Sequence, residues 1–387
     1  VSAEAQANTR KERRWQVPLQ IRITTRGKTA THRILLTGGT LRLDLPNGFE
    51  SALVNAGGHG FYRVQYDAAL LERLLQLVPD GLSPIERFNL VNDARAATLA
   101  GRMPLTDYLD LTARFTSDRD KNVWAILIDS FNEVNLIIRP EERPALERLV
   151  RDRLGPAVTE LGWTPQSGED ELRRQLRADL LAAMGTIGND PAVQQRTAEL
   201  YAEYTNAAAS GQPSPLDPNL LPAMITILAY TGEAARYEQF LHRFRKAATP
   251  QEERRFLYSL AMFRQPALLE RTLARTINGE VRTQDGPFLV RLMLMNVYGR
   301  ELAWQFVKAN WETMDRLFPK NGLRRLCGGI VGLATPDLER DVRKFFLTRN
   351  VDLGGKALEQ YLEQLHILVT LRQRTGTALP IALRPPA

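Results

Sequence analysis

The sequence predicts a mostly α-helical protein, an irregular HEAT- or armadillo-like helical solenoid in the form of a bowl, preceded by a small β-sandwich. Three observations support this prediction. Apolar residues recur with a period of two in residues 15–66, as in short strands. From Asp67 onward the period is close to 3.6, as in amphipathic helices. No fixed repeat length is visible, so the helical array is expected to be irregular.

The predicted strands lie at the N-terminal end of the chain, in a small sandwich domain over residues 1–66. In VPLQIRI, Val17, Leu19, Ile21 and Ile23 alternate with polar neighbours. Four further apolar segments, RILL, LRLDL, ALVN and FYRVQY, are separated by turn-forming runs such as TTRGKT, TGGT and PNGFE. We therefore expect about five strands. The first strands of the sandwich are expected to be missing if this start is a boundary within a longer chain.

The helices follow over residues 67–387, which form the second predicted domain. SPIERF opens with a complete start signal, in which Ser83 caps, Pro84 takes the first helical position and Glu86 bonds back. TPQEER repeats this arrangement, and three Asp-Pro or Thr-Pro pairs suggest further starts at residues 190, 217 and 335. We expect about fourteen to sixteen helices that stack in antiparallel pairs, because none can bury its apolar face alone. Residues 166–171 and 206–219 are the predicted exposed loops.

Composition limits the function classes. The chain has 387 residues, 44% hydrophobic and 25% charged, which is ordinary for globular proteins. The net charge of +7 is small for this length, and acidic residues interrupt the arginine-rich segments, so no nucleic-acid partner is expected. No segment has the length of apolar residues needed to span a membrane. The start lacks the apolar run of a signal peptide, which says nothing about the parent protein if this start is a boundary within a longer chain. A cytoplasmic location is the expectation for the parent.

The residues that usually carry catalysis form no recognisable site. None of the four histidines, His32, His59, His242 and His366, has a second histidine at the ligand spacing of a zinc helix. The lone Cys327 excludes internal disulfides and is expected to be a buried structural thiol. The glycines of AGGHG precede a predicted strand, so they cannot present helix-start amides to a phosphate. No metal ligand and no catalytic residue is therefore assigned to this chain.

Five ordered segments resemble the zinc aminopeptidases of the aminopeptidase N type. WQVPLQI resembles a sandwich strand of that family, and residues 60–67, GFYRVQYD, resemble its junction between sandwich and helices. Residues 87–93 are similar to its Arg-x-x-Leu-x-x-Asp helix, through Arg87, Leu90 and Asp93. GEVRTQD resembles an Arg-x-Gln-Asp turn. GRELAWQFVKANW is similar to a tryptophan-containing helix, through Trp304, Phe306, Asn310 and Trp311.

The resemblance implies the C-terminal part of such an enzyme, similar to the C-terminal domain of endoplasmic reticulum aminopeptidases. In that family the zinc ligands and the general base lie in a preceding domain, so the parent protein would be the enzyme and would hold the zinc. This chain would be its non-catalytic helical cap. Its partners would be the catalytic domain of the same parent chain and the peptide substrate, which the bowl encloses while closure gates the active site.

Arg282 is the one substrate-binding residue that the resemblance suggests, because some relatives hold the peptide's carboxylate with a basic residue on the inner wall. The alternative is that Arg282 and Asp285 simply pair to fix their turn. Other functions of the whole chain remain as alternatives.

The chain could be an autonomous helical-repeat scaffold that binds protein or peptide partners. A basic solenoid that binds nucleic acid and an enzyme with a novel site are the further alternatives.

Overall fold

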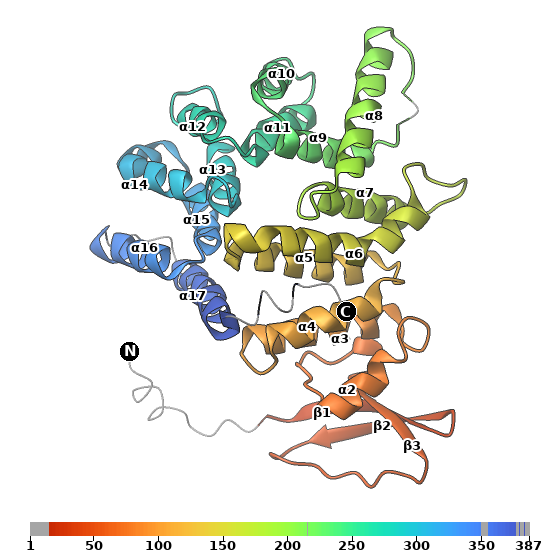
Figure 1. Ribbon diagram of the computed structural model, residues 1–387. Coiled ribbons are helices and arrows are strands. Elements are labelled where there is room, and N and C mark those ends of the chain that lie inside the picture. Colours follow the sequence, from red (N-terminus) through yellow and green to blue (C-terminus); the bar gives the residue numbers. More distant parts are fainter. Residues whose placement is uncertain (1–14, 215, 350–354, 377–378, 380–382, 384–387) are drawn as a thin grey trace. The chain divides into compact units, whose positions relative to one another are not determined.

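The computed structural model describes residues 15–214, 216–349, 355–376, 379 and 383 (Figure 1). Residues 1–14 of the predicted sandwich domain lie outside the described residues. The chain divides into two compact units, Val1–Ala97 and Thr98–Ala387. The sequence had placed its boundary between residues 66 and 67, where strands give way to helices.

The first unit contains a three-stranded antiparallel sheet in the order β2-β1-β3. Its strands are β1 (Val17–Thr25), β2 (Lys28–Leu36) and β3 (Phe49–Val54), followed by η1 (Ala56–Gly58), α2 (Ala68–Leu75) and the start of α3 (Pro84–Leu99). Arg26 and Gly27 both have positive φ, at 46° and 71°, as a tight β1–β2 hairpin turn requires. Ile21, Ile23 and Leu53 are buried and form the core of the sheet.

The prediction of about five strands was wrong. Residues 41–45 and 61–66 alternate as strands do, yet neither forms part of the sheet. In the second segment the Val64 amide donates to the Asp93 carboxylate at 3.2 Å instead of to a neighbouring strand. In the first, Leu41, Leu43 and Leu45 stay substantially exposed. Alternation reports which side chains share a face, but a strand also needs a backbone partner.

Two carboxylates on α3 connect the elements of the first unit. Glu86 accepts from the Ser83 amide at 2.9 Å, which confirms the predicted back-bond of the capping box, and also from Gly57 and from Arg22. Burial alone would raise the pKa of Glu86, but these hydrogen bonds hold it below its usual value. Asp93 accepts from Arg63, and here burial outweighs the ion pair and raises the pKa. The two resembling segments around residues 63 and 93 are thus joined by one carboxylate.

The second unit is entirely helical in its described part. Its helices are α4 (Leu105–Thr112), α5 (Lys121–Ile137), α6 (Arg143–Leu161), α7 (Glu171–Gly185), α8 (Pro191–Ala209), α9 (Leu220–Thr231), α10 (Ala234–Arg245), α11 (Pro250–Ser259), α12 (Pro266–Arg275), α13 (Gly286–Met295), α14 (Arg300–Leu317), α15 (Lys320–Cys327), α16 (Pro336–Arg349) and α17 (Ala357–Thr375). Short 3-10 segments, η2 (Ala113–Phe115), η3 (Pro140–Glu142), η4 (Leu260–Met262) and η5 (Gly328–Gly332), extend or join them. With α2 and α3, the described residues hold sixteen α-helices, so the mostly helical fold class is confirmed.

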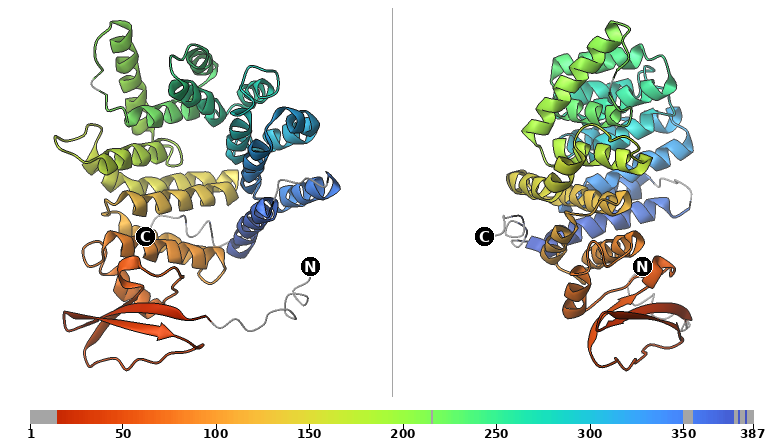
Figure 2. Two further views of the ribbon diagram at one scale, coloured as in Figure 1. Left: turned by 180° about the vertical axis from the view of Figure 1, so that it is seen from behind. Right: turned by 90° about the vertical axis from the view of Figure 1, so that its right-hand side faces the viewer.

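Odd- and even-numbered helices form two layers in this unit. The odd helices from α5 to α17 each contact the next odd helix, and α17 contacts α5, which closes an inner ring. The helices α8, α10, α12, α14 and α16 lie outside this ring (Figures 1 and 2). Trp304 and Trp311 of α14 are buried against Phe345 and Phe346 of α16, which anchors one outer pair. Alternating helices of this kind confirm the predicted solenoid of stacked pairs.

The predicted helix starts and loops are mostly observed. Asp190 and Thr249 cap α8 and α11, and α16 begins at Pro336 as expected. The helix expected near Asp217 begins at Leu220. The loop predicted over residues 206–219 is shorter, because α8 continues to Ala209. In the loop 166–171 the Glu169 side chain is buried rather than exposed, since it pairs with Arg177 at 2.7 Å.

Cys327 lies at the end of α15 and is fully buried, as predicted. Burial raises the pKa of its thiol to about 12. The reactive thiolate is therefore scarce at neutral pH, and reagents cannot reach it. We expect no reaction with a disulfide reagent such as DTNB in the native state and one equivalent of reaction after denaturation. Rapid native labelling, followed by absorbance, would contradict this burial.

Candidate functional site

The C-terminal ends of the inner helices converge on one small region of the second unit. The last turns of α5, α9 and α13, the residues after α7 and the 3-10 turn η4 after α11 all contribute to it. Helix C-termini carry partial negative charge and unsatisfied carbonyl groups. Arg300 supplies both a positive charge and hydrogen-bond donors at these helix ends. Its Nη1 donates to the carbonyls of Leu136 at 2.7 Å and Gly332 at 2.9 Å. We call this region the hub.

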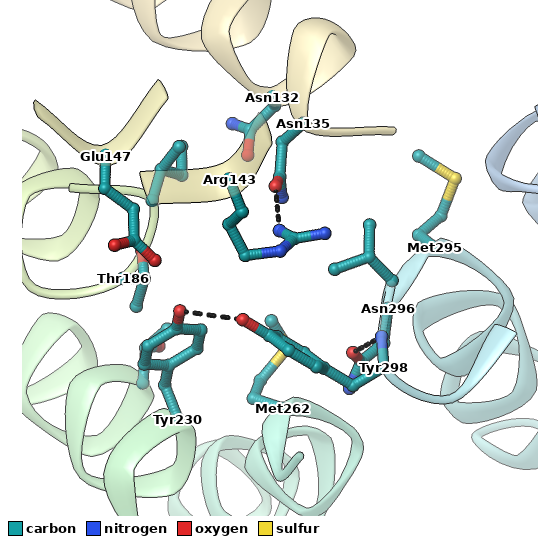
Figure 3. Close-up of a pocket in the computed structure, with 13 residues that line it drawn as sticks. Asn132, Asn135, Arg143, Glu147, Thr186, Tyr230, Met262, Met295, Asn296 and Tyr298 are labelled. Atoms are coloured by element: carbon teal, nitrogen blue, oxygen red, sulfur yellow. Dashed lines mark hydrogen bonds between the residues drawn. The ribbon is translucent and has the colours of Figure 1, made fainter. Parts of the chain in front are cut away.

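A cavity of about 130 Å³ lies in the hub, here called the hub pocket (Figure 3). Its lining mixes amides, hydroxyls, methionines and one charge of each sign; the residues are Asn132, Asn135, Arg143, Glu147, Thr186, Ile187, Thr226, Tyr230, Met262, Met295, Asn296, Val297 and Tyr298. Sites for whole drug-sized ligands are several times larger. The hub pocket therefore has room for one side chain or one chain end.

Two tyrosines and two arginines contact one another at the hub pocket. The hydroxyls of Tyr230 and Tyr298 are 3.1 Å apart, and the Arg264 guanidinium stacks over both rings, at 4.5 and 5.6 Å from their centres. Arg143 stacks over Tyr298 at 5.1 Å and donates to the Asn135 side chain (Figure 3). Burial, and then the hydrogen bond to Tyr298, raise the pKa of Tyr230, so the Tyr230 hydroxyl stays protonated and can donate. The pocket thus offers several donors to a carbonyl or carboxylate oxygen.

A second hollow adjoins the hub pocket along α7 and α9. This groove of about 340 Å³ is lined mostly by small and polar residues of α5, α7 and α9, including Gln175, Ala182, Asn219 and Thr226. Thr226 lines both hollows, so the groove and the hub pocket lie next to each other on α9. Its two charges neutralise each other, because Lys121 and Asp179 form an ion pair at 3.1 Å.

Arg282 lies in the turn before α13. Its guanidinium donates to Glu253 of α11 at 2.8 Å and is 65% exposed. Asp285 instead accepts from the Tyr258 hydroxyl at 3.0 Å, so Arg282 and Asp285 do not pair with each other as the alternative had supposed. The Arg282 guanidinium therefore stays accessible to solvent beside α11. Its contact with substrate stays a prediction.

The sequence analysis did not identify Arg143, Tyr230 and Tyr298 as candidate site residues. They lie on α6, on α9 and after α13, and no spacing along the chain connects them. One weak signal existed: Thr226 and Tyr230 are four residues apart on α9, a helix that is otherwise almost wholly apolar. Polar groups at that spacing on an apolar helix indicate a polar cavity.

The four histidines are scattered over β2, the residue after η1, α10 and α17. Within the described ranges, no group of three or more histidine, cysteine, aspartate or glutamate side chains could hold a metal ion. None of the described helices combines the length and apolar character that crossing a lipid bilayer requires.

A family model described as the ERAP1-like C-terminal domain matches residues 52–367 of this chain. The chain is 29% identical over 323 residues to Aminopeptidase M1-A of Oryza sativa subsp. japonica, covering 81% of the chain and 36% of that protein. It is 26% identical over 367 residues to Glutamyl aminopeptidase of Sus scrofa, covering 90% and 37%. It is also 26% identical over 334 residues to Aminopeptidase 2, mitochondrial, of Saccharomyces cerevisiae, covering 84% and 34%. The chain thus spans little more than a third of the length of these relatives.

Proposed function

The chain belongs to the ERAP1-like C-terminal domain family, and from this premise we propose that it is the non-catalytic C-terminal domain of a zinc aminopeptidase. In this proposal a preceding domain of the same parent chain holds the zinc and cleaves N-terminal residues from peptides. The helical unit encloses the peptide and gates access to the active site. The observation that carries the proposal is the family match, which runs from the sheet through almost all of the helices.

The inner surface of the helical unit supports the role in enclosure. The groove and the hub pocket adjoin, and their walls present amides and hydroxyls that can hydrogen-bond a peptide backbone. The size of the hub pocket suits one residue or one chain end. Enclosing a peptide against such a wall excludes water, which strengthens every polar contact with it.

Arg282 is proposed as one contact with the enclosed peptide. Its guanidinium uses one nitrogen for Glu253 and leaves the rest of its fork available to a carboxylate. The exposed position costs little desolvation before a peptide arrives. The cytoplasmic location of the parent stays a prediction.

Aminopeptidase assays on this chain and on its full-length parent test the proposed function. With added zinc and an amino-acid amide substrate, we expect hydrolysis by the parent alone and loss of that activity with a zinc chelator. Zinc-dependent hydrolysis by the 387-residue chain itself would contradict the proposal. An inactive parent, together with tight capture of a folded protein by the chain, would favour the autonomous scaffold instead.

A further inference from the structure

Three arginines project from the inner helices α11, α13 and α15 without a carboxylate partner. Arg254, Arg291 and Arg325 are all exposed, and we call them the arginine face. Within the part of the chain that the structure describes, none of the three forms an ion pair. The Glu253 carboxylate pairs with Arg282, and the Asp285 carboxylate accepts a hydrogen bond from the Tyr258 hydroxyl.

An aromatic ring positions one member of the arginine face, Arg325. The Arg325 guanidinium lies over the Phe288 ring at 4.9 Å, and this ring is 6.2 Å from that of Tyr258. The positive fields of Arg254 and Arg325 reach the Tyr258 hydroxyl, although burial dominates and raises the pKa of Tyr258 to about 12. A guanidinium stacked on a ring loses little of its freedom to hydrogen-bond in the ring plane. Arg325 is therefore pre-positioned for a ligand.

One member of the arginine face, Arg291, lies on the same face of α13 as a residue of the hub pocket. Arg254 and Tyr258 precede Met262 by eight and four residues, and Arg291 precedes Met295 by four. Arg291 and Met295 both lie in α13, four residues apart, and so share one of its faces, whereas Met262 lies in η4 beyond the end of α11. Met262 and Met295 both line the hub pocket. A peptide that follows this face of α13 into the hub pocket would therefore pass Arg291.

Charge is distributed unevenly over this inner surface. The α7–α9 groove carries one internally neutralised pair, Lys121 and Asp179. The arginine face carries three positive charges, none of them in an ion pair within the described residues, and one carboxylate, that of Asp285, lies nearby. Like charges on one face repel each other, and the repulsion grows when water is excluded. An anionic occupant would relieve it.

We propose that Arg254, Arg291 and Arg325 bind acidic side chains of the enclosed peptide and so give the domain a preference for acidic peptides. This inference rests on the proposed function, since it takes a peptide to be the occupant of the inner surface. The groove on α7 and α9 holds the neutral part of the peptide. Arginine suits the task because its planar fork matches a carboxylate in a bidentate geometry.

Peptide binding to the 387-residue chain tests this proposal. Two fluorescent peptides of equal length carry either glutamate or glutamine at the same internal positions, and Kd is measured by anisotropy. The triple variant Arg254→Gln, Arg291→Gln, Arg325→Gln is compared with Lys246→Gln, Arg316→Gln, Lys344→Gln. The control removes the same charge from exposed residues at the end of α10 and on α14 and α16.

We expect the unmodified chain to bind the glutamate peptide on the order of tenfold more tightly than the glutamine peptide at low salt. The difference should vanish in the arginine-face variant, persist in the control variant, and shrink as salt screens the charges. Glutamine keeps the helical propensity of the three sites, and a melting curve shows whether each variant is folded. The salt dependence of the unmodified chain is a readout that needs no variant.

Equal affinity for the two peptides, or equal loss in both triple variants, would overturn the proposal while leaving the proposed function standing. A single-stranded oligonucleotide that binds the arginine face more tightly than the glutamate peptide would also overturn it. If neither peptide binds, the arginine-face proposal fails. The aminopeptidase assay then decides separately on the proposed function.

Discussion

Replacing Arg300 by methionine is expected to lower the free energy of unfolding of the helical unit by about 3 kcal/mol. Arg300 is the group that satisfies the carbonyl of Leu136, in the last turn of α5, and that of Gly332, at the end of η5. Neither carbonyl can receive an amide from its own helix at that point. Methionine fills similar space but donates nothing, so two partly buried acceptors lose a charged donor. Calorimetry should show a melting temperature lower by about 5 °C.

Arg316→Met is the matched control on the same helix. Arg316 is exposed near the end of α14 and makes no contact of the kind that Arg300 makes. We expect this control to change stability by no more than about 0.5 kcal/mol. Equal melting temperatures for the two variants would show that the hub does not depend on the Arg300 hydrogen bonds.

Replacing Glu169 by glutamine is expected to destabilise the helical unit by about 3 kcal/mol at neutral pH. The Arg177 guanidinium is almost fully buried and contacts both oxygens of the Glu169 carboxylate at 2.7 Å. Glutamine leaves that cation buried without a counter-charge. Among the described residues, one of its nitrogens, Nη1, already has no hydrogen-bond partner, which makes the site intolerant of a further loss. Urea unfolding measures the effect directly.

A double variant separates the ion pair from simple packing. With both partners apolar, as in Glu169→Leu with Arg177→Met, no uncompensated charge remains, and we expect much of the lost stability to return. Glu171→Gln is the control for loss of a nearby exposed carboxylate. A double variant less stable than Glu169→Gln alone would contradict the buried-charge explanation.

The cost of Glu169→Gln should also depend on pH. Burial by itself would raise the pKa of Glu169, but hydrogen bonds and the charge of Arg177 lower it below the usual value. A carboxylate with a lowered folded pKa stabilises the fold fully above its unfolded pKa, near 4.3. That contribution disappears as pH falls through the folded pKa. The variant and the unmodified chain should therefore converge in stability in acid, below about pH 4.

The sequence pattern misplaced Glu169 and did not single out Arg300, the two residues on which these predictions rest. Glu169 lies in a segment predicted to be an exposed loop, because QSGEDE is polar and contains glycine. Only the position of Arg177 on α7, eight residues later, makes this glutamate a buried ion-pair partner. Arg300 directly follows the Gly299 that opens a resembling helix, and nothing local distinguishes it from other arginines at helix starts.

The sequence by itself determined the order of strands before helices, the helix starts at Ser83, Asp190 and Thr249, and the burial of Cys327. These depend on periodicity and on groups a few residues apart, which local physics fixes. Only the tertiary structure decided the rest. Residues 41–45 have no neighbouring strand to pair with, the inner helices form a closed ring, and the Tyr230 hydroxyl contacts that of Tyr298 at the hub. Such contacts join residues far apart in the chain, and their geometry depends on how every intervening helix packs.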